Sequence, residues 1–297
     1  MIIKFVPGFE SIIGQKQPKR ILATLLRSGI IPHALLFSGI EGVGKRAAAM
    51  TFAMACNCFN RSTEPPQRAG KHSLSVGNQI AEVNPCGHCT SCRKILSGNH
   101  PDIISIIPSG PFIRIAQIRA LCEILSMKPY EAKYRLVIIS DAQTMNPESG
   151  NALLKVLEEP PDRTIIILTA IQTSDLLPTV LSRCQHIRFN PIPRRDLEAR
   201  LVEKEGFYPN EAKIMAVLAN GSFSKALFLK RPLKQTDWTH WRNWLLSASG
   251  QYQPETLSAK PVSFLLAFAE QLTLNKEILL DALAVLNSWL RDLIIYK

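Results

Sequence analysis

The sequence predicts an α/β domain built on a parallel sheet, followed by an all-α tail. Short runs rich in Val, Ile and Leu alternate with helical segments through the first two thirds of the chain, as is typical of a sheet covered on both faces. A Gly-rich loop joins the first of these runs to an Ala-rich helix, and the strand-like runs cease after Pro191-Ile192-Pro193. The 297 residues have room for about two or three domains.

The composition restricts the class of protein. Hydrophobic residues make up 46% and charged residues 20%, a globular composition that excludes wholesale disorder. No apolar run approaches the roughly 20 residues of a membrane span, and residues 1–7 are too short for a secretory signal, so we expect a cytoplasmic protein. The net charge of +11 favours an acidic partner such as nucleic acid or a nucleotide.

Five apolar runs are predicted to be strands. They are residues 33–38, 102–107, 135–140, 164–169 and 185–189. The clearest helix covers residues 147–159, with Asn146 as its N-cap, Pro147 in its first turn and Pro160-Pro161 as its end. Residues 59–85 lack periodicity and predict an exposed insertion.

The last third of the chain is predicted to be helical. Residues 194–230 read as two or three short helices, and Arg231-Pro232 separates them from helices at 262–273 and 276–296. The final helix stays apolar almost to its end without a Gly or Asn stop, so we expect a short or truncated terminal domain. The side chains expected to be partly exposed there are Trp289, Leu293 and Ile295. The alternative is that this helix packs on Phe264, Leu265 and Phe268.

The loop after residues 33–38 reads Gly39-Ile40-Glu41-Gly42-Val43-Gly44-Lys45-Arg46. It fits the pattern G-x-x-x-x-G-K between a strand and a helix, in which backbone N–H groups and the helix N-terminus bind phosphate. The sequence therefore predicts a phosphate-binding loop in which Lys45 reaches the terminal phosphates. Its binding residues are Gly39, Gly42, Gly44 and Lys45.

The groups that hold Mg²⁺ in an ATPase are altered. A Ser or Thr hydroxyl normally follows the lysine and binds Mg²⁺, but this chain has Arg46, a cation. A carboxylate should end a later strand, where this chain has Ser140, with Asp141 one residue late. Because Mg²⁺ supplies much of the charge neutralisation in phosphoryl transfer, we predict a degenerate loop without hydrolysis. Binding of nucleotide without hydrolysis stays open.

The cysteines predict a metal site. Three of the seven lie in the array Cys86-x-x-Cys89-x-x-Cys92, and such clustering in a reducing compartment indicates metal rather than disulfides. Thiolates at this spacing can surround a tetrahedral Zn²⁺, which needs a fourth ligand. The candidates for that ligand are Cys56, Cys58, His88 and His100. Cys122 and Cys184 are predicted to be ordinary buried thiols.

Four segments carry a specific combination of motifs. They are Gly39–Lys45, Arg119 within residues 113–119, the block Asn-Ala-Leu-Leu-Lys-Val-Leu-Glu-Glu-Pro-Pro at residues 151–161, and Leu181-Ser182-Arg183-Cys184. Together they resemble the AAA+ clamp loader subunits of bacterial DNA polymerase III, over residues from about 9 to 230. The resemblance implies a RecA-like AAA+ P-loop domain with a parallel sheet over residues 1–190. A helical lid would cover residues 191–231 and an all-α helical collar residues 232–297.

The resemblance also implies residue roles. Ser140 stands where hydrolysing members have a metal-binding Asp, and Lys225 stands where they carry a sensor arginine. Both departures match the family's rigid stator subunit rather than the hydrolysing gamma/tau subunits. Arg183 would act as an arginine finger in trans, reaching the γ-phosphate of ATP on a neighbouring subunit.

A zinc module and a set of partners follow from the same resemblance. The family's zinc module lies at about residues 56–92 and favours Cys58 as first ligand, with Cys56 as runner-up. The implied ligand set is Cys58, Cys86, Cys89 and Cys92. The implied partners are gamma/tau and delta subunits in a hetero-pentameric ring and, through the complex, the sliding clamp and primer-template DNA. The isolated chain would catalyse nothing, although it would be a component of the DNA polymerase III holoenzyme.

Two other functions compete with the stator interpretation. The intact Gly39–Lys45 loop is the only good argument for an ATP-hydrolysing clamp loader subunit of gamma/tau type. The net charge and the cysteines favour a zinc-dependent nucleic-acid binder. That function would need aromatic side chains around the cluster, and residues 85–99 contain no Phe, Trp or Tyr. The stator interpretation therefore leads.

Overall fold

A computed structural model describes residues 7–60 and 83–229. The chain divides into two compact units, Met1–Lys225 and Ala226–Lys297. The predicted collar at 232–297 lies outside the described residues, together with its helices and with Trp289, Leu293 and Ile295. Most of the predicted insertion at 59–85 lies outside them too.

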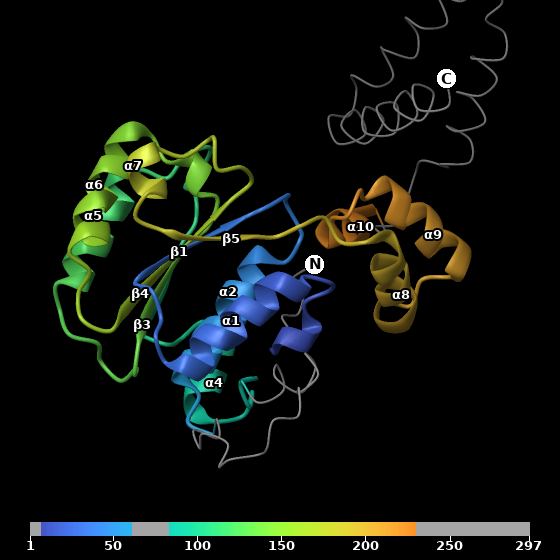
Figure 1. Ribbon diagram of the computed structural model, residues 1–297, viewed down its shortest axis with the longest axis horizontal. Coiled ribbons are helices and arrows are strands. Elements are labelled where there is room, and N and C mark those ends of the chain that lie inside the picture. Colours follow the sequence, from blue (N-terminus) through green and yellow to red (C-terminus); the bar gives the residue numbers. More distant parts are fainter. Residues whose placement is uncertain (1–6, 61–82, 230–297) are drawn as a thin grey trace, which may run out of the picture. The chain divides into compact units, whose positions relative to one another are not determined.

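A five-stranded parallel sheet forms the centre of the first unit (Figure 1), with the strand order β2-β3-β4-β1-β5. The strands are β1 (Ala34–Ser38), β2 (Ile103–Ile106), β3 (Arg135–Ile139), β4 (Thr164–Ala170) and β5 (Gln185–Arg188). Each of the five predicted runs is therefore a strand. Every residue of β1, β3 and β4 is buried, because helices cover both faces of a sheet of this kind.

Helices pack against both faces of the sheet. α1 (Lys16–Ser28) and α2 (Lys45–Asn57) lie on one face, and α5 (Ile115–Leu125) and α6 (Pro147–Glu158) lie on the other (Figure 1). Apolar residues of α5 and α6, Leu121 and Leu153 among them, form one core cluster with β1, β3 and β4. The smaller elements are the 3₁₀ turns Phe9–Ser11 and Ala142–Thr144, α4 (Thr90–Leu96) and α7 (Pro178–Leu181). The α/β prediction with a parallel sheet is confirmed.

The helix α6 begins at its predicted cap. The Oδ1 atom of Asn146 accepts a hydrogen bond of 2.9 Å from the backbone N–H of Ser149, which satisfies a donor that the first turn leaves free. The helix packs closely on α7, because a Cβ on Gly150 would lie only 2.6 Å from Cδ1 of Leu177. Glu158, the last residue of α6, and Arg183, two residues after α7, are both described with the candidate site below.

Three short helices follow the sheet. They are α8 (Arg194–Glu205), α9 (Pro209–Leu218) and α10 (Phe223–Leu229). The first two pack together and bury Leu197 and Leu201 of α8 and Ala212 and Ala216 of α9. The sequence predicted two or three helices here, whereas the domain boundaries at residues 190 and 231 stay predictions.

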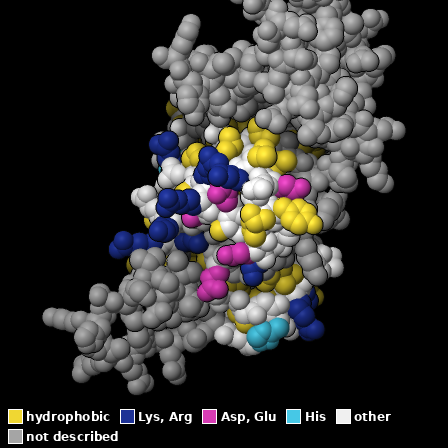
Figure 2. All heavy atoms as spheres, turned by 90° about the vertical axis from the view of Figure 1, so that its right-hand side faces the viewer, with side chains coloured by type: hydrophobic (Ala, Val, Ile, Leu, Met, Phe, Trp, Pro, Cys, Tyr) yellow, Lys and Arg dark blue, Asp and Glu magenta, His cyan; other side chains and the backbone are white. Residues whose placement is uncertain are grey.

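The surface of the described region carries both charge signs. On the face shown in Figure 2, Lys and Arg side chains gather toward one side, with acidic and apolar side chains beside them. On this face the positive charge is therefore concentrated at one side and does not cover the whole surface. None of the helices in residues 7–60 and 83–229 is long and apolar enough to cross a bilayer.

Candidate functional site

The Gly-rich loop connects the carboxyl end of β1 to the first residue of α2, Lys45, as the phosphate-binding pattern requires. Gly39, Gly42 and Gly44 all have positive φ. A Cβ on Gly42 would overlap Oγ of Ser222, so glycine is needed there for close approach as well as for its backbone conformation. The predicted loop is thus present in the predicted context.

The side chain of Lys45 turns back into this loop. Its ammonium group donates hydrogen bonds to the carbonyl oxygens of Gly39 and Ile40, the second at 2.9 Å, and the residue is 7% exposed. Burial lowers the pKa of Lys45, while the nearby carboxylates of Asp141 and Glu41 act in the opposite direction. To bind a phosphate, Lys45 would have to give up these carbonyl partners.

The start of α10 contacts the middle of the loop. The backbone N–H groups of Phe223 and Ser224 donate to the carbonyl oxygen of Gly42, at 3.0 and 3.4 Å. These donors belong to the N-terminal turn of a helix, where N–H groups have no partner within the helix. Lys225, the residue at the sensor position, is exposed. The loop is therefore held by the ammonium group of Lys45 and by the backbone N–H groups of Phe223 and Ser224.

The metal-organising positions of an ATPase hold no carboxylate. Ser140 follows β3, is 6% exposed, and its hydroxyl has no hydrogen-bond partner among the described residues. Asp141 has a left-handed backbone conformation, with φ of 53°, and its N–H donates to Oγ1 of Thr169 at 3.2 Å. Arg46 is exposed on α2. The carboxylate and the hydroxyl that organise Mg²⁺ in a hydrolysing subunit are thus replaced by Ser140 and Arg46, and Asp141 offers a carboxylate one residue later.

Arg183 lies just after α7, and its guanidinium has partners on two sides. Its Nη2 atom is 2.7 Å from Oε1 of Glu158, the last residue of α6. Its Nη1 atom donates to the carbonyl oxygen of Thr179 at 2.9 Å and to Oγ of Ser182 at 3.3 Å. The side chain of Arg183 is 34% exposed and that of Glu158 is 51% exposed. The predicted arginine is therefore oriented and still reachable from outside.

Four cysteine sulfurs form a cluster. The Sγ atoms of Cys58, Cys86, Cys89 and Cys92 lie within 4.8 Å of one another. A tetrahedral ion with metal–sulfur bonds of about 2.3 Å needs sulfur separations of about 3.8 Å, so the cluster fits a metal ion with small shifts. Among the other candidates, Cys56 is buried in α2 outside the cluster, and His88 is exposed. The structure brings together the four cysteines that the resemblance favoured.

Backbone N–H groups point at three of these sulfurs. The N–H of Cys86 donates to Sγ of Cys58 and that of Cys89 to Sγ of Cys86, both at 3.3 Å, and that of Cys92 donates to Sγ of Cys89 at 3.5 Å. Against the effect of burial, the N–H groups of Cys92 and Phe59 lower the pKa of the Cys89 thiol to about 6. Burial raises the pKa of Cys58 and of Cys92. Such N–H groups stabilise thiolates, the form that binds a metal.

The other two predicted thiols behave as ordinary cysteines. Cys122 and Cys184 are half-buried and belong to the surroundings of the main core cluster. Burial raises the pKa of both, that of Cys184 to about 11, so both stay protonated at neutral pH.

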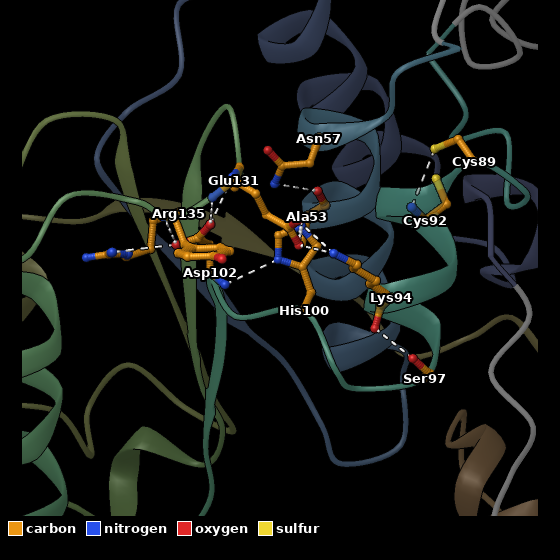
Figure 3. A network of polar contacts seen from close by, with 12 residues as sticks. Ala53, Asn57, Cys89, Cys92, Lys94, Ser97, His100, Asp102, Glu131 and Arg135 are labelled. Carbon is orange, nitrogen blue, oxygen red and sulfur yellow. Dashed lines mark hydrogen bonds and ion pairs between the residues drawn. The ribbon is translucent and has the colours of Figure 1, made fainter.

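A buried carboxylate belongs to the network of polar contacts in Figure 3, which also contains Cys89 and Cys92 of the cysteine cluster. Asp102 is 1% exposed, and its oxygens accept three backbone hydrogen bonds of 2.8 Å from Tyr130, Glu131 and Ala132. Nη2 of Arg135 lies 3.5 Å from Oδ1 of Asp102. Burial by itself would raise the pKa of Asp102, but these bonds and the arginine outweigh it and hold that pKa below its usual value. No sequence motif marks this residue.

The segment before β3 also binds both sides of the cysteine cluster. Asn57, which precedes Cys58, donates to the carbonyl oxygen of Tyr134 at 2.9 Å and accepts from its N–H at 3.0 Å. Lys94 of α4 forms an ion pair of 2.7 Å with Glu131 (Figure 3). The two helices that flank the cysteine cluster, α2 and α4, are thus both attached to the segment before β3 through Glu131 and Tyr134.

Replacing Asp102 with alanine is expected to lower the free energy of unfolding by about 1–3 kcal/mol, because three backbone N–H groups would lose their acceptor and Arg135 would lose its carboxylate. The guanidinium of Arg135 keeps the carbonyl oxygens of Ile124, Met127 and Lys128. Denaturant unfolding of the variant and of the wild type measures this difference. Asp162, an exposed loop residue, supplies the matched control as Asp162→Ala. A loss below about 1 kcal/mol for Asp102→Ala would show that the network contributes little.

Comparison with known proteins assigns this chain to a family. The model of the family described as DNA polymerase III, delta subunit, matches residues 14–193. DNA polymerase III subunit delta' of Bacillus subtilis is 34% identical over 221 residues, 74% of this chain and 60% of that protein. DNA polymerase III subunit gamma/tau of Mycobacterium tuberculosis is 31% identical over 227 residues, 74% of this chain and 36% of that protein. The chain thus spans less than two thirds of the length of these relatives.

A solved structure agrees on the fold. A variant of RuvB from Thermotoga maritima superimposes with a TM-score of 0.50 at 14% identity, over 76% of this chain and 64% of that one. This similarity supports the AAA+ P-loop fold and nothing finer. The segment matched by the family model is more than half of the chain and contains the phosphate loop, the cysteine cluster and Arg183. The chain therefore belongs to the DNA polymerase III delta subunit family.

Proposed function

We propose that this chain is the delta-prime subunit of a bacterial DNA polymerase III clamp loader. In this role it acts as a stator that does not hydrolyse ATP. It supplies Arg183 to ATP on a neighbouring gamma/tau subunit while the sliding clamp is loaded onto primed DNA. The observation that carries the proposal is the contrast between its two sites. Lys45 is engaged by its own loop and Ser140 replaces a metal ligand, whereas Arg183 is oriented and partly exposed.

The chemistry of the arginine follows from its charge and shape. A guanidinium supplied in trans stabilises the charge that develops on a transferred phosphoryl group, an effect of about 10³–10⁵ in kcat in other systems. Arginine has five N–H donors in a rigid plane. The contacts of Arg183 with Glu158, Thr179 and Ser182 engage the two terminal nitrogens and leave further donors for an anion.

The remaining parts of the proposal concern partners and metal. The partners are gamma/tau and delta subunits in a hetero-pentameric ring in the cytoplasm, and the complex contacts the sliding clamp and primer-template DNA.

Zn²⁺ held by the four clustered cysteines would connect the end of α2 to α4 as a structural ion, because four thiolates leave no open coordination position. The residues that hold α2 and α4 on the segment before β3 support this role.

Reconstitution tests the proposed function directly. This chain is mixed with gamma/tau and delta subunits of the same organism, the clamp, ATP and primed DNA, and clamp loading is measured with and without it. We expect loading only when this chain is present. Equal loading without it would overturn the proposal.

A gamma/tau-type ATPase is the second candidate, favoured by the intact Gly39–Lys45 loop. For the isolated chain we expect no ATP turnover above background, because Arg46 replaces the Mg²⁺-binding hydroxyl and Ser140 replaces the Mg²⁺-binding carboxylate. A phosphate-release assay measures it, with Lys45→Ala as the control. Turnover of about 1 s⁻¹ or more that Lys45→Ala abolishes would establish the second candidate instead.

A further inference from the structure

We propose that Glu158 is the positioning residue for Arg183, an inference that rests on the proposed function. The carboxylate holds the guanidinium in the orientation in which it meets a phosphate on a neighbouring subunit. Glu158 touches no reacting atom in this scheme, and it acts only through the arginine.

The contacts fix the guanidinium at both terminal nitrogens. Glu158 binds Nη2 at 2.7 Å, the length of a strong charge-assisted hydrogen bond. The other terminal nitrogen, Nη1, donates to the carbonyl oxygen of Thr179 and to Oγ of Ser182. A free arginine side chain has about 2 kcal/mol of rotamer entropy to lose when it is ordered. Because the guanidinium of Arg183 is already held by these contacts, less rotamer entropy is lost when it binds a phosphate, and binding is correspondingly more favourable.

The backbones that carry the two residues are also fixed relative to each other. Gly150 in α6 lets Leu177, the residue before α7, approach closely, and Val180 of α7 is buried in the core shared with α6. Because α6 and α7 are held by this packing, the carboxylate of Glu158 stays within reach of Arg183.

The exposure of the pair argues against a purely structural role. The side chains of Glu158 and Arg183 are 51% and 34% exposed. Ion pairs in such positions contribute little to folding stability. The loss of Glu158 should therefore appear in turnover rather than in stability.

The test uses the reconstituted complex with this chain as wild type, Glu158→Gln, Arg183→Ala or the double variant. Glu158→Gln is expected to lower the DNA- and clamp-stimulated kcat for ATP by about tenfold with KM within about twofold, because orientation in the transition state is lost and nucleotide binding is not. The double variant is expected to be no slower than Arg183→Ala alone. Glu159→Gln, a substitution at the adjacent exposed glutamate, is the matched control and should leave kcat unchanged.

The outcomes separate this inference from the proposed function. If Arg183→Ala leaves kcat unchanged, the trans role of the arginine is wrong and the positioning role fails with it. If Arg183→Ala slows turnover but Glu158→Gln leaves kcat unchanged or raises it, only the positioning role is overturned. A double variant clearly slower than Arg183→Ala would also overturn it, because Glu158 would then act by another route.

Discussion

Replacing Arg183 with alanine is expected to reduce ATP turnover by the assembled clamp loader about 10³-fold, at the lower end of the range known for arginine fingers. In the proposed mechanism the guanidinium of Arg183 neutralises charge on the phosphoryl group of ATP bound to a neighbouring subunit, and alanine removes that charge. Steady-state hydrolysis in the presence of clamp and primed DNA measures the effect.

The same variant should remain folded. Arg183 is partly exposed and its ion pair lies at the surface, so the free energy of unfolding should change by less than about 1 kcal/mol. Arg195→Ala, at an exposed arginine of α8, controls for loss of a positive charge. Wild-type turnover by the Arg183→Ala complex would show that this arginine is an ordinary surface charge.

Removing the metal from the cysteine cluster is the second large perturbation. Freshly purified, unchelated protein is expected to contain one Zn²⁺ per chain, and Cys86→Ser should lose it. Structural zinc sites contribute about 10–16 kcal/mol of apparent binding free energy in small domains, so chelation should strongly destabilise the region around α4. Elemental analysis and thermal unfolding with and without chelator measure both effects.

The choice of ligands has its own control. Cys56→Ser should keep the metal, because Cys56 is buried in α2 outside the cluster. Cys58→Ser should lose it. The reverse result would move the first ligand to Cys56, and protein purified with less than about half an equivalent of zinc would contradict the metal site itself.

The sequence predicted those parts of the fold that depend on local pattern. The central strands are continuous runs of Val, Ile and Leu, and the cap of α6 needs only Asn146 and Pro147, so both are visible within a few residues. The edge strand β2 covers Ile103–Ile106, one residue shorter at each end than the predicted run 102–107, and the carbonyl oxygen of Asp102 still accepts from the N–H of Leu136 in β3.

In the candidate site, the sequence predicted residues that belong to short motifs but not the contacts between segments that are distant in the sequence. The cysteine spacing and the Ser182-Arg183-Cys184 motif identified their residues, although the resemblance was needed to choose Cys58. Glu158 and Arg183 are far apart in the sequence, and the residues that bind Asp102 follow it at no regular spacing, so no periodic pattern reveals either contact. The contacts of Lys45 with the carbonyl oxygens of Gly39 and Ile40 could not be predicted, because the phosphate-loop pattern specifies the lysine and not its partners within the chain. That Lys45 reaches the terminal phosphates of a nucleotide stays a prediction.

The engagement of Lys45 with Gly39 and Ile40 has a thermodynamic consequence. A protein that binds nucleotide only when folded gains stability with the logarithm of the nucleotide concentration. Nucleotide that binds this loop must first displace two carbonyl oxygens from the ammonium group of Lys45, so we expect a smaller gain in stability than in a loop whose lysine is free. In the ring that we propose, such a subunit would keep one shape while its neighbours bind and release nucleotide.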